Sequence, residues 1–127
     1  KNMALKDNKK LRVDAKDPKL EFKAWPEYYE YDGEPFNGYE TYGFEPNENP
    51  AQGITISAEC EYRDGFRMGW YRKYFPNGNV KSERLDLFET PLLNIFYNEQ
   101  GIEVDRFKSV SQAFYDEVIA EYNILDK

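Results

Sequence analysis

Histidine is missing from this chain of 127 residues, and cysteine occurs once, as Cys60. Without histidine the chain cannot form a Ser-His-Asp triad or a Cys-His nucleophile pair. A zinc site of the usual type would have almost no ligands, because such sites are built from cysteine and histidine side chains. A single cysteine excludes an intramolecular disulfide bond, so packing must hold the fold together. We therefore expect a protein that is not an enzyme and that has no cofactor and no metal ion.

Long apolar stretches are missing as well. No segment approaches the roughly 20 apolar residues that a membrane-spanning helix needs, so we expect no membrane contact. The lone cysteine fits a reducing compartment, and we expect a cytoplasmic protein. Because the sequence begins at Lys1, a removed signal peptide is the alternative, which would make the protein periplasmic or a lipoprotein.

Aromatic residues, by contrast, are abundant, with eleven Tyr, nine Phe and two Trp. Such side chains pack well on a pleated surface and favour strands. Turn signals such as Asp-Gly and Asn-Gly recur about every 11 to 14 residues after residue 54, which leaves room only for short strands joined in sequence. We expect a mainly β fold: one domain over residues 1–127, with an antiparallel β-meander over residues 20–107 and a polar N-terminal arm over residues 1–18.

The clearest strand covers residues 54–62. Ile54, Cys60 and Tyr62 fall on one face of it, and Glu59 and Glu61 fall on the other. We expect the first face to meet the core, with Cys60 as a small buried side chain, and the second to meet solvent or a partner.

The C-terminal segment has a helical pattern. Ser109 or Ser111 can cap a helix that begins near Val110, and apolar residues then recur at three- and four-residue steps from Phe114 to Leu125. We expect one α-helix over residues 109–125 that packs on the meander and covers an apolar surface.

A repeated pattern occupies residues 69–83. Its parts are Gly69, Tyr71, the pair Tyr74-Phe75, the turn Asn77-Gly78 and the tail Val80-Lys81-Ser82-Glu83. Tyr74 and Gly78 recur 23 residues later as Tyr97 and Gly101. The pattern resembles a MORN-type repeat of the variety found in bacterial antitoxin and immunity-like proteins. That resemblance implies hairpins whose aromatic residues form a core stack, and a function in binding another protein.

Charge is unevenly distributed along the chain. Residues 21–64 carry eleven acidic and two basic side chains, a net charge of −9, whereas residues 1–20 carry +4. An acidic, tyrosine-rich surface would repel nucleic acid and attract a basic protein, such as a nuclease. The alternative is that these charges keep an aromatic-rich protein soluble.

Either tryptophan could anchor a partner. Trp70 is the stronger candidate, because it is out of step with Tyr71 and should point to the opposite face of its strand.

Our first hypothesis is an immunity or antitoxin-like protein that occludes the active site of a basic toxin. We expect its binding residues to be the charge partners Glu59, Glu61 and Asp64 and the aromatic anchors Tyr39, Tyr42 and Trp70. The second hypothesis is a structural or envelope-associated repeat protein without a toxin partner. A third, an enzyme with paired carboxylates, would need a deep pocket lined by two acidic residues whose pKa values are raised. The pattern does not determine the oligomeric state.

Overall fold

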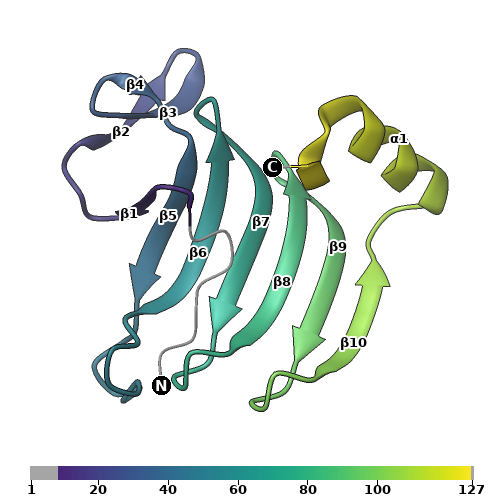
Figure 1. Ribbon diagram of the computed structural model, residues 1–127. Coiled ribbons are helices and arrows are strands. Elements are labelled where there is room, and N and C mark those ends of the chain that lie inside the picture. The colour runs from purple at the N-terminus through teal and green to yellow at the C-terminus, as the bar shows by residue number, and fades with distance from the viewer. Residues whose placement is uncertain (1–8, 127) are drawn as a thin grey trace.

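The computed structural model describes residues 9–126, which form two β-sheets and a C-terminal helix (Figure 1). The elements are β1 (Arg12–Asp14), β2 (Leu20–Ala24), β3 (Glu27–Tyr31), β4 (Glu34–Pro35), β5 (Gly38–Gly43), β6 (Ile56–Arg63), β7 (Phe66–Tyr74), β8 (Val80–Leu87), β9 (Thr90–Tyr97), β10 (Glu103–Lys108), α1 (Gln112–Tyr122) and the short 3-10 helix η1 (Ile124–Asp126). The expectation of a mainly β fold with a meander and one helix is confirmed.

The large sheet has the order β1-β5-β6-β7-β8-β9-β10. From β5 to β10 each strand pairs antiparallel with the next in sequence, which is the expected meander. Asp64 and Gly65, at the tip of the β6–β7 hairpin, both have positive φ (52° and 87°), as tight hairpin turns require.

The strand β1 falls inside the expected polar arm. Residues 1–8 of that arm lie outside the described residues. Residues 12–14 pair in parallel with β5, so the prediction of a polar arm is wrong for these three residues. Val13 explains the difference, because it is buried among Phe36, Cys60 and Tyr62. One apolar side chain in a lysine-rich segment is a weak signal for a strand.

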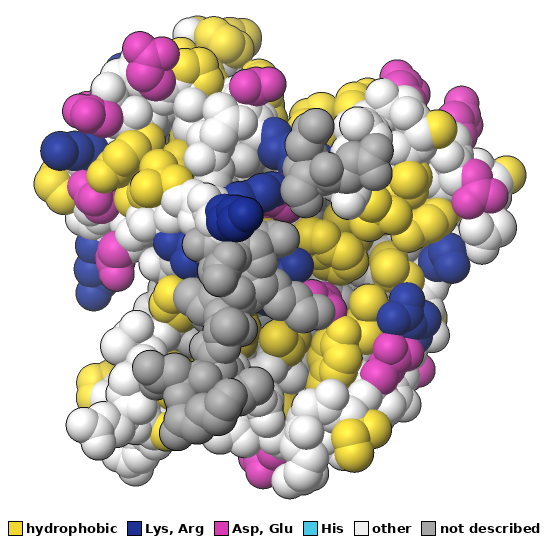
Figure 2. Space-filling model, viewed as in Figure 1, with side chains coloured by type: hydrophobic (Ala, Val, Ile, Leu, Met, Phe, Trp, Pro, Cys, Tyr) yellow, Lys and Arg dark blue, Asp and Glu magenta, His cyan; other side chains and the backbone are white. Residues whose placement is uncertain are grey.

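The small sheet consists of β2, β3 and β4 and lies beside the β1–β5–β6 end of the large sheet (Figure 1). It was expected to be part of the meander. Instead, Tyr29 packs edge-on against Tyr62 with ring centroids 5.0 Å apart, and this contact joins the two sheets. Carboxylates gather over this part of the molecule, next to exposed apolar side chains (Figure 2, upper left).

The helix α1 packs over the β8 and β9 part of one face of the large sheet, and we call that face the helix face. Val118 of α1 and Ile124 of η1 are buried against Leu85, Leu93 and neighbouring side chains of β8 and β9. The helix begins later than expected because the Ser109 amide still bonds to Leu92 of the sheet, at 2.9 Å. Ser111 is the cap and accepts the Phe114 amide at 3.1 Å.

The apolar residues of the helix are buried less than their spacing predicts. Phe114, Tyr122 and Leu125 keep about two-fifths of their surface or more exposed (41%, 39% and 46%). A helix of eleven residues at the rim of a sheet meets it with only part of its circumference.

Candidate protein-binding surface

Glu59 lies at the centre of a buried network of charged and phenolic side chains on the helix face. Its side chain is completely buried (0% exposed) and accepts hydrogen bonds from Arg12 Nε and Tyr74 Oη, both at 2.7 Å. Arg72 Nη1 lies 3.3 Å from the same carboxylate, and Arg72 Nε donates to Glu83 at 2.6 Å. The expectation that Glu59 faces solvent or a partner is therefore wrong, because arginines from β1 and β7 neutralise it inside the chain.

The pKa values fit this pairing. Burial, the largest influence, lowers the pKa of Arg72, but Tyr39 and Glu83 raise it by more, so the guanidinium stays charged. Burial and the Glu59 carboxylate both raise the pKa of Tyr74, which keeps its hydroxyl protonated and able to donate. The network, which we call the buried charge network (Arg12, Glu59, Arg72, Tyr74 and Glu83), is thus satisfied at neutral pH.

Glu61 is also buried, with 1% of its surface exposed, and the expectation of an exposed charge is wrong here too. It pairs with Lys10 and with Arg63 Nε at 3.1 Å, and it accepts the backbone amide of Trp70 at 3.0 Å. A side chain at Gly69 would place its Cβ 2.0 Å from Glu61 Oε1. The carboxylate of Glu61 therefore passes directly over the first glycine of the repeat pattern, and a side chain at position 69 would have to displace this buried, hydrogen-bonded group.

Two of the three expected aromatic anchors, Tyr39 and Trp70, pack inside the molecule. Tyr39 is fully buried (0% exposed) and bonds to Arg72 Nη1 at 2.9 Å, so it does not meet a partner. Trp70 points to the opposite face from Tyr71, as expected, but that face is the one covered by α1, and Trp70 packs half-buried against the core there. Pointing away from Tyr71 would make Trp70 accessible only if the opposite face of the sheet were open to solvent.

Tyr42 and Asp64 remain accessible, but the structure does not bring them together. Tyr42 is 42% exposed and lines a cleft with Glu45 and Lys73. Asp64 lines a different cleft with Lys10 at the tip of the β6–β7 hairpin. The six expected binding residues therefore do not form one site.

Exposed aromatic side chains gather instead at the end of the large sheet nearest the small sheet. Tyr28, Phe66, Phe88 and Tyr122 form a continuous row, with successive ring centroids 6.1, 6.3 and 5.9 Å apart. We call these four residues the aromatic row. The last three are 40%, 42% and 39% exposed, although they come from β7, the β8–β9 turn and α1. Exposed apolar patches of this kind are typical of interaction sites, so the aromatic row is the candidate binding surface.

Trp25 lies at the tip of the β2–β3 hairpin and is 94% exposed. It is joined to β3 by Pro26, while Ala24 and Glu27 on either side of the tip still pair with each other. The sequence identifies Trp25 and Trp70 as two possible anchors and favours Trp70. The structure favours Trp25 instead, because Trp25 is exposed and Trp70 is half-buried.

Phe88 adopts a left-handed backbone conformation, with φ of 57°. Glycine, asparagine or aspartate usually occupies such a turn position, because a bulky side chain costs about 1–2 kcal/mol there. Pro91 predicts a turn near Thr90, but no glycine, asparagine or aspartate stands at position 88, so neither the left-handed conformation nor the exposure of Phe88 could be foreseen.

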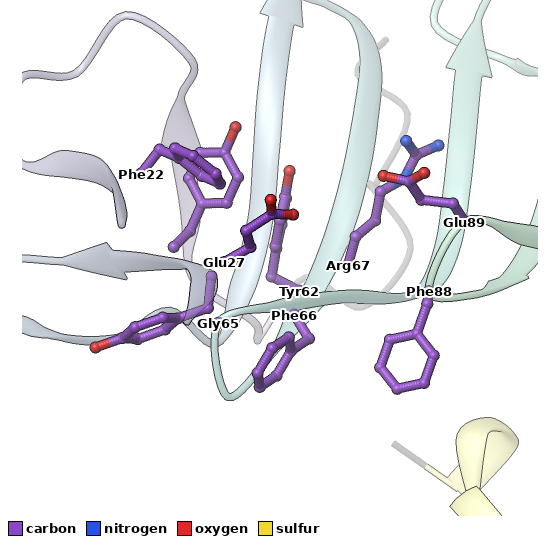
Figure 3. Close-up of a pocket in the computed structure, with 10 residues that line it drawn as sticks. Phe22, Glu27, Tyr62, Gly65, Phe66, Arg67, Phe88 and Glu89 are labelled. Carbon is purple, nitrogen blue, oxygen red and sulfur yellow. The ribbon is translucent and has the colours of Figure 1, made fainter. Parts of the chain in front are cut away.

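A pocket of about 580 Å³ opens beside the aromatic row, between the two sheets (Figure 3). Its lining includes the exposed carboxylates Glu27 and Glu89. Neither of them makes a hydrogen bond or ion pair with any residue between 9 and 126. The surrounding segment of residues 20–35 carries five acidic side chains and one basic side chain, a net charge of −4. This end of the molecule therefore combines exposed aromatic rings with unpaired negative charge.

The opposite face of the large sheet offers little reactive chemistry. Burial raises the pKa of the Cys60 thiol to about 12, which makes it a poor nucleophile at neutral pH. Arg67 and Arg84 lie over the ring of Tyr71 and both bond to Asp86, at 3.2 and 2.8 Å. These charges are held by each other rather than offered to a substrate.

Two further findings concern the described part of the chain, residues 9–126. It contains no group of three acidic or cysteine side chains placed to hold a metal ion. It also contains no helix that is both long and apolar enough to span a bilayer.

Comparison with protein-family models, curated proteins and solved structures finds no match for this chain. The MORN-type resemblance of residues 69–83 therefore stays a prediction.

Proposed function

We propose that this protein binds a basic protein partner and neutralises it, in the manner of an immunity protein or antitoxin. The single observation that carries the proposal is the aromatic row with unpaired carboxylates beside it. Aromatic residues are enriched at protein interfaces and among the few residues that contribute most of the binding energy, and surrounding charge sets the rate and choice of partner.

Three properties of the surface support a protein rather than a small molecule as partner. The aromatic row runs across β3, β7, the β8–β9 turn and α1, so it is extended rather than enclosed. Trp25 projects from the neighbouring small sheet and would enlarge the contact. The strained backbone of Phe88 keeps an aromatic ring exposed at a cost in stability, which is typical of functional positions.

The negative charge of the surface selects a basic partner. Toxins that cleave nucleic acid are basic because they bind phosphate backbones, and an acidic surface competes for the same patch. The protein would then act by covering that patch, without catalysis of its own.

The test is inhibition of a toxic neighbour. The chain is co-expressed with the product of the adjacent gene, and growth rescue is measured for the parent, for the double variant W25A/F88N and for F107A. Phe107 is an equally exposed phenylalanine (48%) on the edge strand β10, outside the aromatic row, and so serves as the matched control.

We expect the parent and F107A to rescue growth and W25A/F88N to fail. Loss of rescue in F107A alone would move the interface to β10. If the adjacent product is harmless but binds the chain through the aromatic row, a structural role without a toxin partner replaces the proposal.

A further inference from the structure

The pocket beside the aromatic row has the composition of a receptor for a cationic side chain. Phe22 and Tyr29 form one aromatic wall, with ring centroids 5.3 Å apart, and Phe66 and Phe88 form another, at 6.3 Å. In Figure 3, Glu27 and Glu89 lie on either side of the space, with Phe66 and Phe88 along its lower rim.

These two kinds of side chain favour the same ligand chemistry. An aromatic face attracts a cation through its quadrupole, and the attraction grows as the cation loses water. A carboxylate pairs with the same cation directly. Arginine suits both better than lysine does, because its planar guanidinium stacks on rings and is weakly hydrated.

One lining residue, Arg67, is itself a cation. Its Nη2 lies 3.2 Å from Asp86, which is buried, and its guanidinium lies over Tyr71 at 5.6 Å. Asp86 offsets this charge only in part, because it also pairs with Arg84. The lining still carries two carboxylates against this one guanidinium, a net charge of −1. Glu27 and Glu89 have no such partner within residues 9–126 and leave the pocket with unneutralised negative charge.

The size of the pocket fits an arginine carried on a peptide segment. Its volume of about 580 Å³ is larger than a single side chain needs and falls within the range of about 300–1,000 Å³ that buries a compact ligand. It lies at the junction of the two sheets, with Phe22 and Glu27 from the small sheet and Phe66 from the large one.

We propose that this pocket receives an arginine side chain of the basic partner, with the guanidinium held by the aromatic walls and by Glu27 and Glu89. This inference rests on the proposed function and names the part of the partner that the surface recognises.

The test uses the whole chain, labelled with ¹⁵N, and three short peptides as probes. These are acetyl-Gly-Arg-Gly-amide, the same peptide with citrulline, which has nearly the shape of arginine without its charge, and the same peptide with lysine. Backbone amide shifts are followed during titration of the parent, of the variant E27Q/E89Q and of the control variant E45Q/E48Q. Glu45 and Glu48 are carboxylates that line the separate cleft beside Tyr42.

We expect saturable shifts at residues that line the pocket, with binding of the arginine peptide about tenfold tighter than that of the citrulline peptide. E27Q/E89Q should weaken arginine binding by a similar factor, and E45Q/E48Q should leave it unchanged. Equal binding of the arginine and citrulline peptides would overturn the inference, as would equal losses in both variants. Tighter binding of the lysine peptide would also overturn the choice of arginine.

The failure of this inference can be told apart from the failure of the proposed function. If the peptides do not bind but W25A/F88N still abolishes growth rescue, the interface stands and the arginine pocket is wrong. If the arginine peptide binds as expected but no variant of the aromatic row affects rescue, the pocket stands and the proposed interface is wrong.

Discussion

Charged side chains are usually exposed and aromatic side chains usually buried, but two regions of this molecule, the helix face and the end of the large sheet with the aromatic row, show the reverse. On the helix face, Glu59 and Arg72 are buried, whereas at the end of the sheet Phe66 and Phe88 are exposed. Buried charges are costly unless every one is paired, and exposed rings are costly unless something covers them. The first region meets its requirement within the chain. In the proposed function, the second meets it only when a partner binds, and this difference would separate the residues that hold the fold from those that bind the partner.

The largest effect is expected from breaking the buried charge network. Glu59→Ala leaves Arg12, Arg72 and Tyr74 without their shared acceptor and should lower the free energy of unfolding by about 3–5 kcal/mol. Chemical denaturation measures the change. Glu27→Ala is the control, because its exposed carboxylate has no partner within residues 9–126 and its removal should stay within about 0.5 kcal/mol. Similar values for both variants would contradict the comparison between the two regions.

A somewhat smaller effect is expected at Gly69. Gly69→Ala adds a Cβ that would lie 2.0 Å from Glu61 Oε1, on a backbone with φ of 117°, and should cost about 2–3 kcal/mol. In the Glu61→Ala background the contact with the carboxylate is gone, while the backbone strain and a contact of 3.2 Å with the Cβ of residue 61 remain, so the same change should cost less. Denaturation of the four proteins in this double-mutant cycle measures the coupling. A coupling of zero would show that Glu61 does not require the glycine.

Alkaline pH should lower the free energy of unfolding, because buried groups of the interior resist losing their protons. Burial raises the pKa of Cys60 from 9.0 to about 12 and also raises that of Tyr62. Between pH 9 and 12 the unfolded chain has released the thiol proton and the folded chain has not, so stability falls as pH rises. For Cys60 alone the loss at pH 10.5 is about 2 kcal/mol. Urea midpoints at pH 7.5 and 10.5 measure it, and Cys60→Ala should show a smaller drop; an identical drop would exclude the thiol as a cause.

The smallest effect on stability is expected at Phe88, where the effect on function should be large. Phe88→Asn relieves the left-handed strain but loses the edge-on contacts with Phe66 and Tyr122, so stability should change by less than about 1 kcal/mol. Affinity for the partner should nevertheless fall, by at least tenfold if Phe88 is a main anchor. Thermal unfolding and a binding titration separate the two quantities. Unchanged affinity would remove Phe88 from the interface.

The meander and the helix could be predicted because their signals are local. Asp64-Gly65 fixes a hairpin, and Ser111 followed by apolar residues at helical spacing starts a helix. The candidate site could not be predicted in the same way. The alternation of side chains along β6 places Glu59 and Cys60 on opposite faces. It cannot show that both faces are buried, because Glu59 is buried by pairing with Arg12, which lies 47 residues away in the sequence. The aromatic row likewise joins residues from four separate elements and has no sequence period.

The pairing of β1 bears on the order in which the molecule is assembled. β1 hydrogen-bonds to β5, and Arg12 and Lys10 reach glutamates 47 and 51 residues further along the chain. Contacts between such distant segments form slowly, after the local hairpins. We expect the hairpins of β5 to β10 to form first and β1 to dock onto the finished sheet, so that the buried glutamates lose their water only at this last step.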